Sequence, residues 1–451
     1  MIHFNDFFTN ELFDSGTLHT LFLTLTISSA ALVFSWFFSL VFLYFRNRFI
    51  FTFFRVLSVL PGFAYALMVL SLLRTLGVEH RYSMVSVFLA WILAGVPYLC
   101  LSISTSIQDL DKREKEVLQC LGASPIWAFY HFEFLRTLPA QAQVLLQQFW
   151  LYLTSFSLVM ILGGGYPNET LEVGIYTSVR LDRVNFTHAL ALGLWQILLL
   201  IPLRVLLNRI QKSSKTAVRE GYQNLMPWKR SLKTIGFVGL GLVLILIVVE
   251  CFSKFQNSEV LSAVNSLLAS LGTSLVLAST CAICTLICAG FFYYFGLGFG
   301  AELGAYLSPM LFTLIWWKYF GFTVLPFANA LIVQIILFLP WVARSLYPLL
   351  KRMRVSELEA ARSLGCSPLR SWLSVEWPRV RAGVFFSLAW VLVLSLSEVT
   401  SVLLFSQNEF EPLSVWVQNA FMRFHIDEAL MGTAVLVFFS YLFLTLGMKR
   451  T

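Results

Sequence analysis

The sequence predicts an all-α polytopic membrane protein of about eleven transmembrane helices, forming two parallel repeats of a five-helix core, each with a helical cytoplasmic loop. Hydrophobic residues make up 58% of the 451 residues and charged residues 12%, against about half and about a quarter in soluble domains. Apolar runs long enough to cross a bilayer recur along the whole chain, which excludes a soluble or disordered protein. An open sheet is excluded because its edges would leave backbone groups unsatisfied in lipid.

A basic stretch at residues 209–234 divides these apolar runs into two groups. The runs before it lie at about residues 18–45, 53–73, 84–107, 142–162 and 189–207. Those after it lie at about residues 235–252, 263–295, 303–325, 327–350, 384–405 and 429–448. We therefore assign residues 1–208 to a first repeat, 209–234 to a cytoplasmic linker and 235–451 to a second repeat, whose first run is an additional helix.

The distribution of basic residues sets the expected orientation. With the linker inside the cell, all but seven of the 32 Lys and Arg residues lie inside, the exceptions being Arg74, Arg81, Arg180, Arg183, Lys254, Lys318 and Arg423. The positive-inside rule then places the N-terminus in the periplasm and the C-terminus in the cytoplasm of a bacterial inner-membrane protein. The net charge of +8 is thus explained by topology, and no nucleic-acid partner is expected.

One segment of the first repeat recurs in the second. Residues 116–125, followed by Glu133 and Arg136, align with residues 359–368, followed by Glu376 and Arg379, at a constant offset of 243. Both copies lie in long basic loops on the same side of the membrane, so the repeats are expected to be parallel. The cavity between two such bundles is the expected pathway.

The offset of 243 also pairs Pro97 with Pro340, in the third core helix of each repeat. A proline inside a helix removes a backbone hydrogen bond and produces a kink. Such a kink either acts as the hinge of a gate or only shapes the bundle.

Each copy of the repeated segment predicts a short amphipathic helix, a tight turn and a second helix. Gly122 and Gly365 are expected to end the first helix in the left-handed conformation. Ser124 and Ser367 are expected to cap the next helix, each followed by a proline at its first position. An exposed amphipathic helix suits docking into a groove on a partner, whereas the alternative is a helix that lies on the lipid surface.

The segment resembles the coupling-helix signature, Glu-Ala-Ala-three residues-Gly, of permease subunits of binding-protein-dependent ABC importers, here fused with two copies. The complete second copy consists of Glu359, Ala360, Ala361 and Gly365. The first copy keeps Glu116 and Gly122 but has Val117 and Leu118 in place of the two alanines.

A narrower resemblance covers residues 162–176 together with Gln196. This stretch is similar to the corresponding part of fused thiamine permeases and of the related ferric-iron permeases, which do not differ reliably here. The chain is expected to depart from the usual form in having no additional span before the first core helix.

The resemblance implies a pathway that alternates between outward and inward openings. Two cytoplasmic ABC ATPase subunits would drive it through loops at about residues 109–140 and 351–382, and a periplasmic substrate-binding protein would deliver the substrate. Glu116 and Glu359 would couple to the ATPases, or would brace their own loops through Arg113 and Arg362. The implied substrate is thiamine, with ferric iron, a polyamine or another small solute as alternatives.

The sequence contains no Gly-x-x-x-x-Gly-Lys-Ser/Thr phosphate loop, so ATP hydrolysis is expected on another subunit and the chain is not expected to be an enzyme. No cofactor is expected. An intramembrane enzyme would need converging catalytic groups, which the apolar runs lack. An ion-coupled secondary transporter is the other alternative, but it should carry more acids inside the membrane and needs no duplicated docking helix.

Glu398 lies inside an apolar run, where a carboxylate is costly and usually faces protein or water. Its counterpart in the first repeat is Ser155. Either Glu398 faces the substrate path or a cation, or it makes a buried structural hydrogen bond.

Two further groups of residues have the composition of ligand sites but lack the neighbouring residues or elements that such sites need. Cys281, Cys284 and Cys288 share a helix face, but no His or acid accompanies them, so no metal site is expected. Gly300 and Gly304 belong to a glycine-rich turn that no strand precedes, which argues against a dinucleotide loop. Close helix packing or a flexible turn is expected there.

Overall fold

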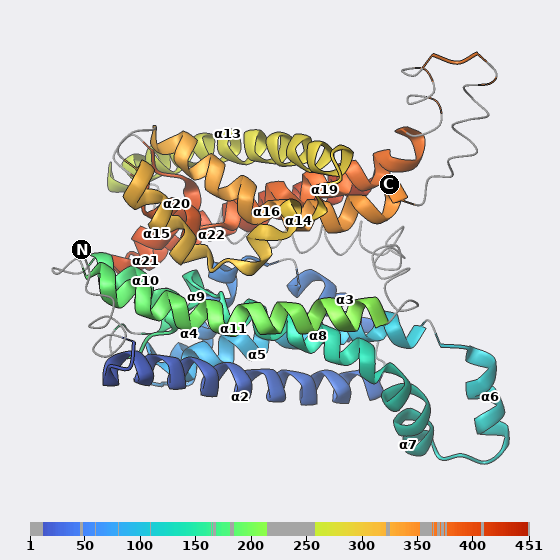
Figure 1. The fold of residues 1–451 in the computed structure, drawn as a ribbon. Coiled ribbons are helices and arrows are strands. Elements are labelled where there is room, and N and C mark those ends of the chain that lie inside the picture. Colours follow the sequence, from blue (N-terminus) through green and yellow to red (C-terminus); the bar gives the residue numbers. More distant parts are fainter. Residues whose placement is uncertain are drawn as a thin grey trace. The chain divides into compact units, whose positions relative to one another are not determined.

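The structure is a computed structural model that describes residues 12–45, 48–58, 60–79, 81–108, 110–163, 165, 168–180, 185–213, 258–321, 325–351, 363, 365–367, 370, 374, 377–406 and 410–449. The regular elements of these ranges are helices, as the sequence predicts (Figure 1). The chain forms two compact units, Met1–Gly239 and Leu240–Thr451. The linker beyond residue 213 and the apolar run 235–252 lie outside the described residues.

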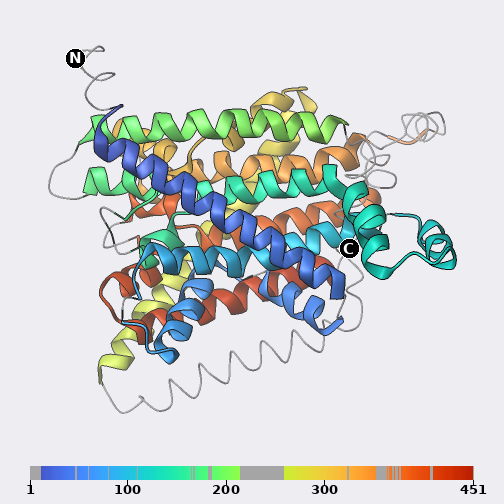
Figure 2. The same ribbon diagram turned by 90° about the horizontal axis from the view of Figure 1, so that it is seen from below.

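The first unit is a bundle of long helices from which a helical loop projects (Figures 1 and 2). Its elements are α2 (Ser15–Phe45), α3 (Arg48–Leu57), α4 (Gly62–Thr75), α5 (Met84–Gln108), α6 (Lys112–Cys120), α7 (Pro125–Ala128), the π-helix η2 (Phe129–Phe134), α8 (Leu135–Leu153), α9 (Ser157–Leu162), α10 (Leu171–Arg180) and α11 (Phe186–Ser213). Within the unit, α5 packs against α2 and α8, and α11 packs against α8 and α10.

The second unit is also built around long helices that pack side by side. Its described elements are α13 (Ser258–Tyr294), α14 (Gly298–Glu302), the 3-10 helix η3 (Leu303–Tyr306), α15 (Pro309–Phe320), α16 (Pro326–Lys351), α19 (Trp377–Ser397), α20 (Thr400–Leu403), α21 (Leu413–Met422) and α22 (Ile426–Lys449). Here α19 packs against α13, α16 and α22.

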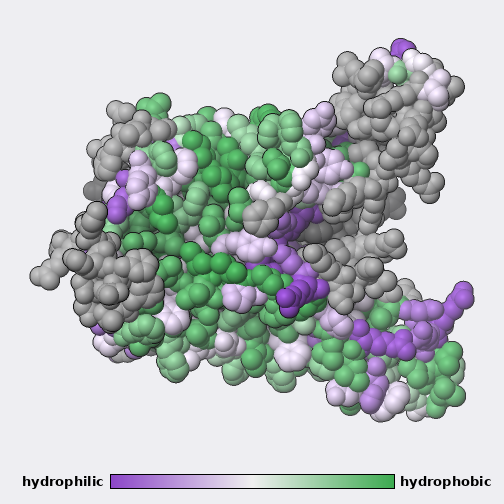
Figure 3. All heavy atoms as spheres, viewed as in Figure 1, coloured by the Kyte–Doolittle hydropathy of each residue, from purple (hydrophilic) through white to green (hydrophobic). Residues whose placement is uncertain are grey.

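Helix α2 shows how these helices divide between protein and lipid. Its buried residues recur every three or four positions and are mostly small or hydroxylated: Thr17, Thr20, Thr24, Ser28, Ala31, Ser35, Ser39 and Leu43. The exposed side carries large apolar side chains, among them Phe22 and Phe37, which are 68% and 59% exposed. Small inward residues let α5 approach closely, while the apolar outer side suits lipid. Figure 3 shows such hydrophobic surface along the helices.

Seven helices in the described part of the chain are long and apolar enough to cross a membrane. They are Ser15–Phe45, Met84–Gln108, Phe186–Ile210, Val264–Tyr294, Pro326–Tyr347, Val380–Ser397 and Ile426–Gly447. The protein is thus a multi-pass membrane protein of all-α fold. The number of eleven spans stays a prediction.

Four of the predicted spans are interrupted rather than continuous. The runs 53–73 and 303–325 divide into α3 with α4 and η3 with α15, and each second helix begins at a proline-containing turn. The runs 142–162 and 384–405 are broken between α8 and α9 and between α19 and α20. Hydropathy averaged over a run does not detect such breaks. A break leaves backbone groups without hydrogen bonds in lipid, so it occurs where other parts of the protein surround it.

The breaks occur at matched positions in the two units. Helix α9 begins at Ser157 and α20 at Thr400, which are 243 residues apart. The helices that follow, α10 and α21, each contain 10 residues. These correspondences support the predicted internal repeat.

Candidate functional site

The projecting loop of the first unit has the predicted helix-turn-helix structure. Helix α6 ends before Gly122, whose φ is +82°. The Ala123 N–H donates to the Leu118 carbonyl at 3.1 Å, which completes a Schellman-type cap. The Ser124 hydroxyl then accepts from the Trp127 N–H at 3.3 Å, with Pro125 at the start of α7. The cap predictions for Gly122 and Ser124 are therefore confirmed.

The second loop shares this turn where it is described. Gly365 also has φ +82°, and the Ser367 hydroxyl accepts from the Arg370 N–H at 3.4 Å. Glu359, Ala360 and Ala361 lie outside the described residues, so the helix predicted there stays a prediction.

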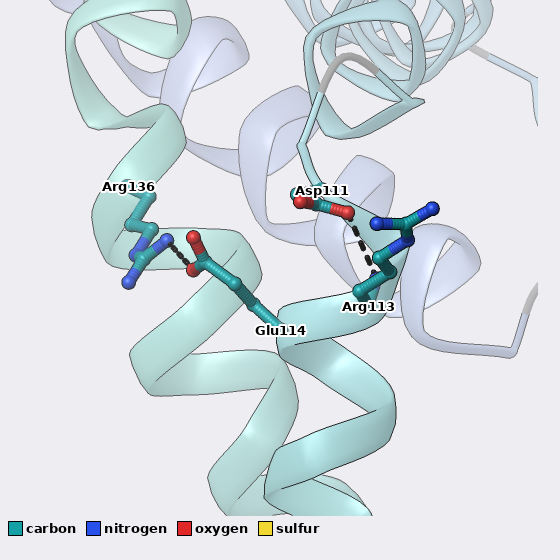
Figure 4. Close-up of polar contacts among 4 residues, drawn as sticks. All are labelled: Asp111, Arg113, Glu114 and Arg136. Carbon is teal, nitrogen blue, oxygen red and sulfur yellow. Dashed lines mark hydrogen bonds and ion pairs between the residues drawn. The ribbon is translucent and has the colours of Figure 1, made fainter.

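Glu116 lies exposed on α6. No hydrogen bond or ion pair joins its described side chain to that of Arg113, and both roles considered for Glu116 stay predictions. Arg113 instead donates its backbone N–H to the Asp111 carboxylate at 2.9 Å. The carboxylate that forms an ion pair across the loop is Glu114, with Arg136 (Figure 4). Sequence reasoning missed this pair, although Arg136 belongs to the repeated pattern.

The tip of this loop presents apolar side chains to solvent. Leu121 is 78% exposed, Ile126 67%, Val117 57% and Trp127 46%. Hydrophobic and hydrophilic residues lie side by side at this projecting end of the unit (Figure 3). Large apolar side chains that are exposed together are typical of a protein interaction site. The loop is therefore suited to docking on a partner.

A π-helical segment, η2, joins this tip to α8. In the second unit, Ser374 is also π-helical, and it lies 243 residues after His131, inside η2. Well under about 1% of residues in proteins are π-helical, and π-bulges often occur at functional sites. Sequence patterns gave no indication of η2 or of π-helical structure at Ser374.

Ser155 and Glu398, the paired candidates for the membrane pathway, both lie in the helix breaks. Ser155 accepts a hydrogen bond from the Trp91 indole at 3.3 Å. The Glu398 carboxylate accepts from the Ser401 N–H at 3.3 Å, and its carbonyl oxygen accepts from the Ser414 hydroxyl at 2.7 Å. Glu398 thus caps α20, which supplies the structural hydrogen bond expected as one alternative.

The polar contacts one turn before these breaks also correspond. In the first unit the Tyr152 hydroxyl donates to the Trp91 carbonyl at 2.7 Å, and the two rings stack with centroids 5.0 Å apart. The residues at the same offset in the second unit are Gln334 and Ser395, where the Ser395 hydroxyl donates to the Gln334 amide oxygen at 2.6 Å. The second unit is therefore the more polar at this level.

Pro97 and Pro340 are both buried inside long helices, α5 and α16. They occupy the same position in each unit, as the sequence predicts. Whether either works as a hinge stays a prediction.

The sequence analysis missed two short helices, α10 and α21. Each is held by its first residue to the first long helix of its unit, α2 or α13. At the start of α10, Leu171 donates its N–H to Thr24 at 3.1 Å, and at the start of α21, Leu413 donates to Ser274 at 2.6 Å. The preceding acids also correspond. Glu169 accepts from Thr177 at 2.9 Å, and Glu411 accepts from Asn419 at 2.6 Å.

Gln196 and the motif that the sequence analysis grouped with it are brought together. The Gln196 amide donates to the fully buried Glu172 carboxylate and to the Leu153 carbonyl, the latter at 3.1 Å. This contact fixes α10 and α11 to the end of α8. The motif therefore positions α10 beside the end of α8.

Replacing Glu169 by glutamine should change the pH dependence of stability. Burial raises the pKa of the Glu169 carboxyl above its ordinary value of 4.5, and the Thr177 hydrogen bond partly opposes this shift. The folded state binds the Glu169 proton more tightly than the unfolded state does. The protonated carboxyl therefore contributes fully to stability below pH 4.5, and this contribution is lost as pH rises through the folded pKa. Glu169→Gln should therefore melt at a higher temperature than the wild type at neutral pH.

Thermal unfolding in detergent, followed by tryptophan fluorescence across this pH range, measures the effect. The matched control is Glu79→Gln, which changes an exposed acid and should leave the pH profile as it is. A profile of Glu169→Gln parallel to that of the wild type would contradict the assignment.

Among the described residues, no group of three His, Cys, Asp or Glu side chains is placed to hold a metal ion. Cys281 is buried, and Cys284 and Cys288 are half-buried on α13. Gly304 packs directly on the backbone of α16, because a Cβ there would lie 2.1 Å from the Ile336 carbonyl oxygen. The predicted close packing at Gly304 is confirmed.

Comparison with known proteins gives relatives that are transport permeases. The chain is 25% identical over 396 residues to the thiamine transport system permease protein ThiP of Haemophilus influenzae, covering 79% of this chain and 71% of the relative. It is 24% identical over 353 residues to the Fe(3+)-transport system permease protein FbpB 2 of the same organism, covering 72% and 68%. A probable sulfate transport system permease protein cysT of Nephroselmis olivacea is 23% identical over 143 residues, covering 32% and 50%.

No family model matches the chain, and no solved structure is significantly similar to it. The two long similarities cover 79% and 72% of the chain, whereas that to the sulfate permease covers 32%. Together with the helical membrane fold, these relatives support an ABC importer permease of the thiamine and ferric-iron group, and they are transport permease subunits rather than enzymes.

Proposed function

We propose that this chain forms the translocation pathway of an ATP-driven importer and couples it to two separate ATPase subunits. The observation that carries the proposal is the projecting loop: a helix capped at Gly122, a second helix capped at Ser124 and an exposed apolar tip. The same left-handed glycine and serine cap recur at Gly365 and Ser367. Two docking loops suit two copies of one ATPase.

In this proposal, Glu116 and Glu359 contact the ATPases, and loops 109–140 and 351–382 carry them. A periplasmic binding protein delivers the substrate to a chain in the inner membrane, with the N-terminus in the periplasm and the C-terminus in the cytoplasm. ATP is hydrolysed on the partner subunits, since the sequence has no phosphate loop.

The proposed substrate is thiamine, with ferric iron as the alternative. The similarity to a thiamine permease covers 79% of the chain and that to a ferric-iron permease 72%. If the Glu398 carboxylate also faces the pathway, beside its hydrogen bond to Ser401, it favours a cationic substrate over an anion such as sulfate. Thiamine and ferric iron are both cations.

Uptake by proteoliposomes tests this proposal. The chain is reconstituted with its ATPase and binding protein, ATP is enclosed, and labelled thiamine, ferric iron and sulfate are offered separately. We expect thiamine uptake that requires both ATP and the binding protein. Uptake of ferric iron but not of thiamine would make ferric iron the substrate. Uptake by the chain without its partners, driven by an ion gradient, would overturn the importer assignment.

A further inference from the structure

Helix α6 has little support from the rest of the first unit. It has only 9 residues, and none of its described side chains is buried. Among the described elements, α7 is the one against which it makes more than marginal contact. An isolated helix shorter than about 12 residues is marginal in water, so the few contacts that α6 makes decide its orientation.

Two polar contacts hold α6. The Asp111 carboxylate accepts from the Arg113 N–H at 2.9 Å and thereby caps the start of the helix. The ion pair between Glu114 and Arg136 connects α6 to the first turn of α8 (Figure 4). The Arg113 side chain points away from this pair in the same view. Of the described polar contacts between side chains, only the ion pair joins α6 directly to α8.

The α8 end of the ion pair is anchored in the bundle. The Arg136 guanidinium lies 4.8 Å from the centre of the Phe132 ring, and Phe132 is only 3% exposed. A planar guanidinium can stack on an aromatic ring and still bind a carboxylate at its edge. Arg136 is therefore held by the core, while Glu114 belongs to a helix that is not.

We propose that Glu114 and Arg136 are positioning residues, which hold α6 at a fixed angle to α8 and pass a displacement of the docked tip into the bundle. This inference rests on the proposed coupling function. Exposed ion pairs contribute little to global stability, but here the pair orients an otherwise weakly held helix. Burial of the pair beneath a docked subunit would strengthen the attraction.

The second repeat has the same charges at the same spacing. Glu357 lies 243 residues after Glu114, and Arg379 lies 243 residues after Arg136. A merely incidental surface contact would not require both acid and base in both copies. The recurrence supports a role that each loop needs.

A charge-swap experiment on the assembled complex tests the inference. Glu114→Arg, Arg136→Glu and the double swap are compared with Glu79→Arg, which reverses an exposed charge outside the two loops. We expect each single variant to assemble with the ATPase. The amount of substrate transported per ATP hydrolysed should fall about two- to fivefold. The double swap should restore most of this loss, and the control should behave as the wild type.

Hydrogen exchange of the amides of residues 112–120, measured on the full chain without the ATPase, gives a second readout. Exchange should accelerate in both single variants and slow again in the double swap. Normal coupling in the single variants, or no recovery in the double swap, would overturn the positioning role. A wild-type chain that never associates with an ATPase would instead overturn the proposed function, and the exchange data would still test the ion pair.

Discussion

Replacing Glu116 and Glu359 together by alanine is expected to abolish substrate stimulation of the partner ATPase. The described Glu116 side chain is exposed, at the edge of an apolar tip. Its carboxylate is thus available to donors on a docked subunit, and a hydrogen bond to a charged group contributes about 1.5–3 kcal/mol. Loss of two such contacts should reduce stimulation by more than about tenfold.

ATPase activity of reconstituted complexes, with and without binding protein and substrate, measures this change. Co-purification of the ATPase is scored in parallel, so that loss of assembly is separated from loss of coupling. Glu79→Ala, which removes an exposed acid outside the loops, serves as the matched control. Full stimulation in the double variant would show that these carboxylates do not couple.

Gly304→Ala is expected to be the most damaging small substitution in the second unit. The new Cβ would lie 2.1 Å from the carbonyl oxygen of Ile336 and 3.0 Å from its carbon. Both atoms belong to the backbone of α16, so relief requires that η3 and α16 separate. Overpacking of this kind costs about 1–3 kcal/mol, and a backbone obstacle places the effect at the upper end.

Gly290→Ala is the matched control, because nothing lies within 4 Å of the added Cβ on α13. Alanine is a better helix former than glycine by about 1 kcal/mol, so this variant should melt at the same temperature as the wild type or above it. Thermal unfolding in detergent compares the two. Equal melting temperatures for Gly304→Ala and the wild type would contradict the packing argument.

Features set by neighbouring residues were predictable from the sequence. The cap at Gly122 and the start of α7 at Ser124 and Pro125 depend on residues within one turn, and the structure reproduces both. Long apolar helices such as α5 and α16 were also predictable, because their composition persists over many turns.

Features that depend on distant residues were not predictable. The breaks at Ser155 and Glu398 lie in apolar runs whose average hydropathy is that of a continuous span. The pair of Glu114 and Arg136 forms only after the chain between them has folded back. Helices α10 and α21 are too short to resemble spans, and contacts with α2 and α13 fix their first residues.

The π-helix η2, together with Ser374, which is π-helical at the matching position of the second unit, bears on the evolutionary history of the chain. A π-turn contains one more residue than the α-helical turn that it replaces. The offset of 243 is the same before the segment, at Glu116 and Glu359, and after it, at Arg136 and Arg379. If the halves descend from one duplicated gene segment, neither has gained or lost a residue here since. The extra residue is then at least as old as the duplication. Deleting one residue from this segment in one half alone would make the two halves differ in length there.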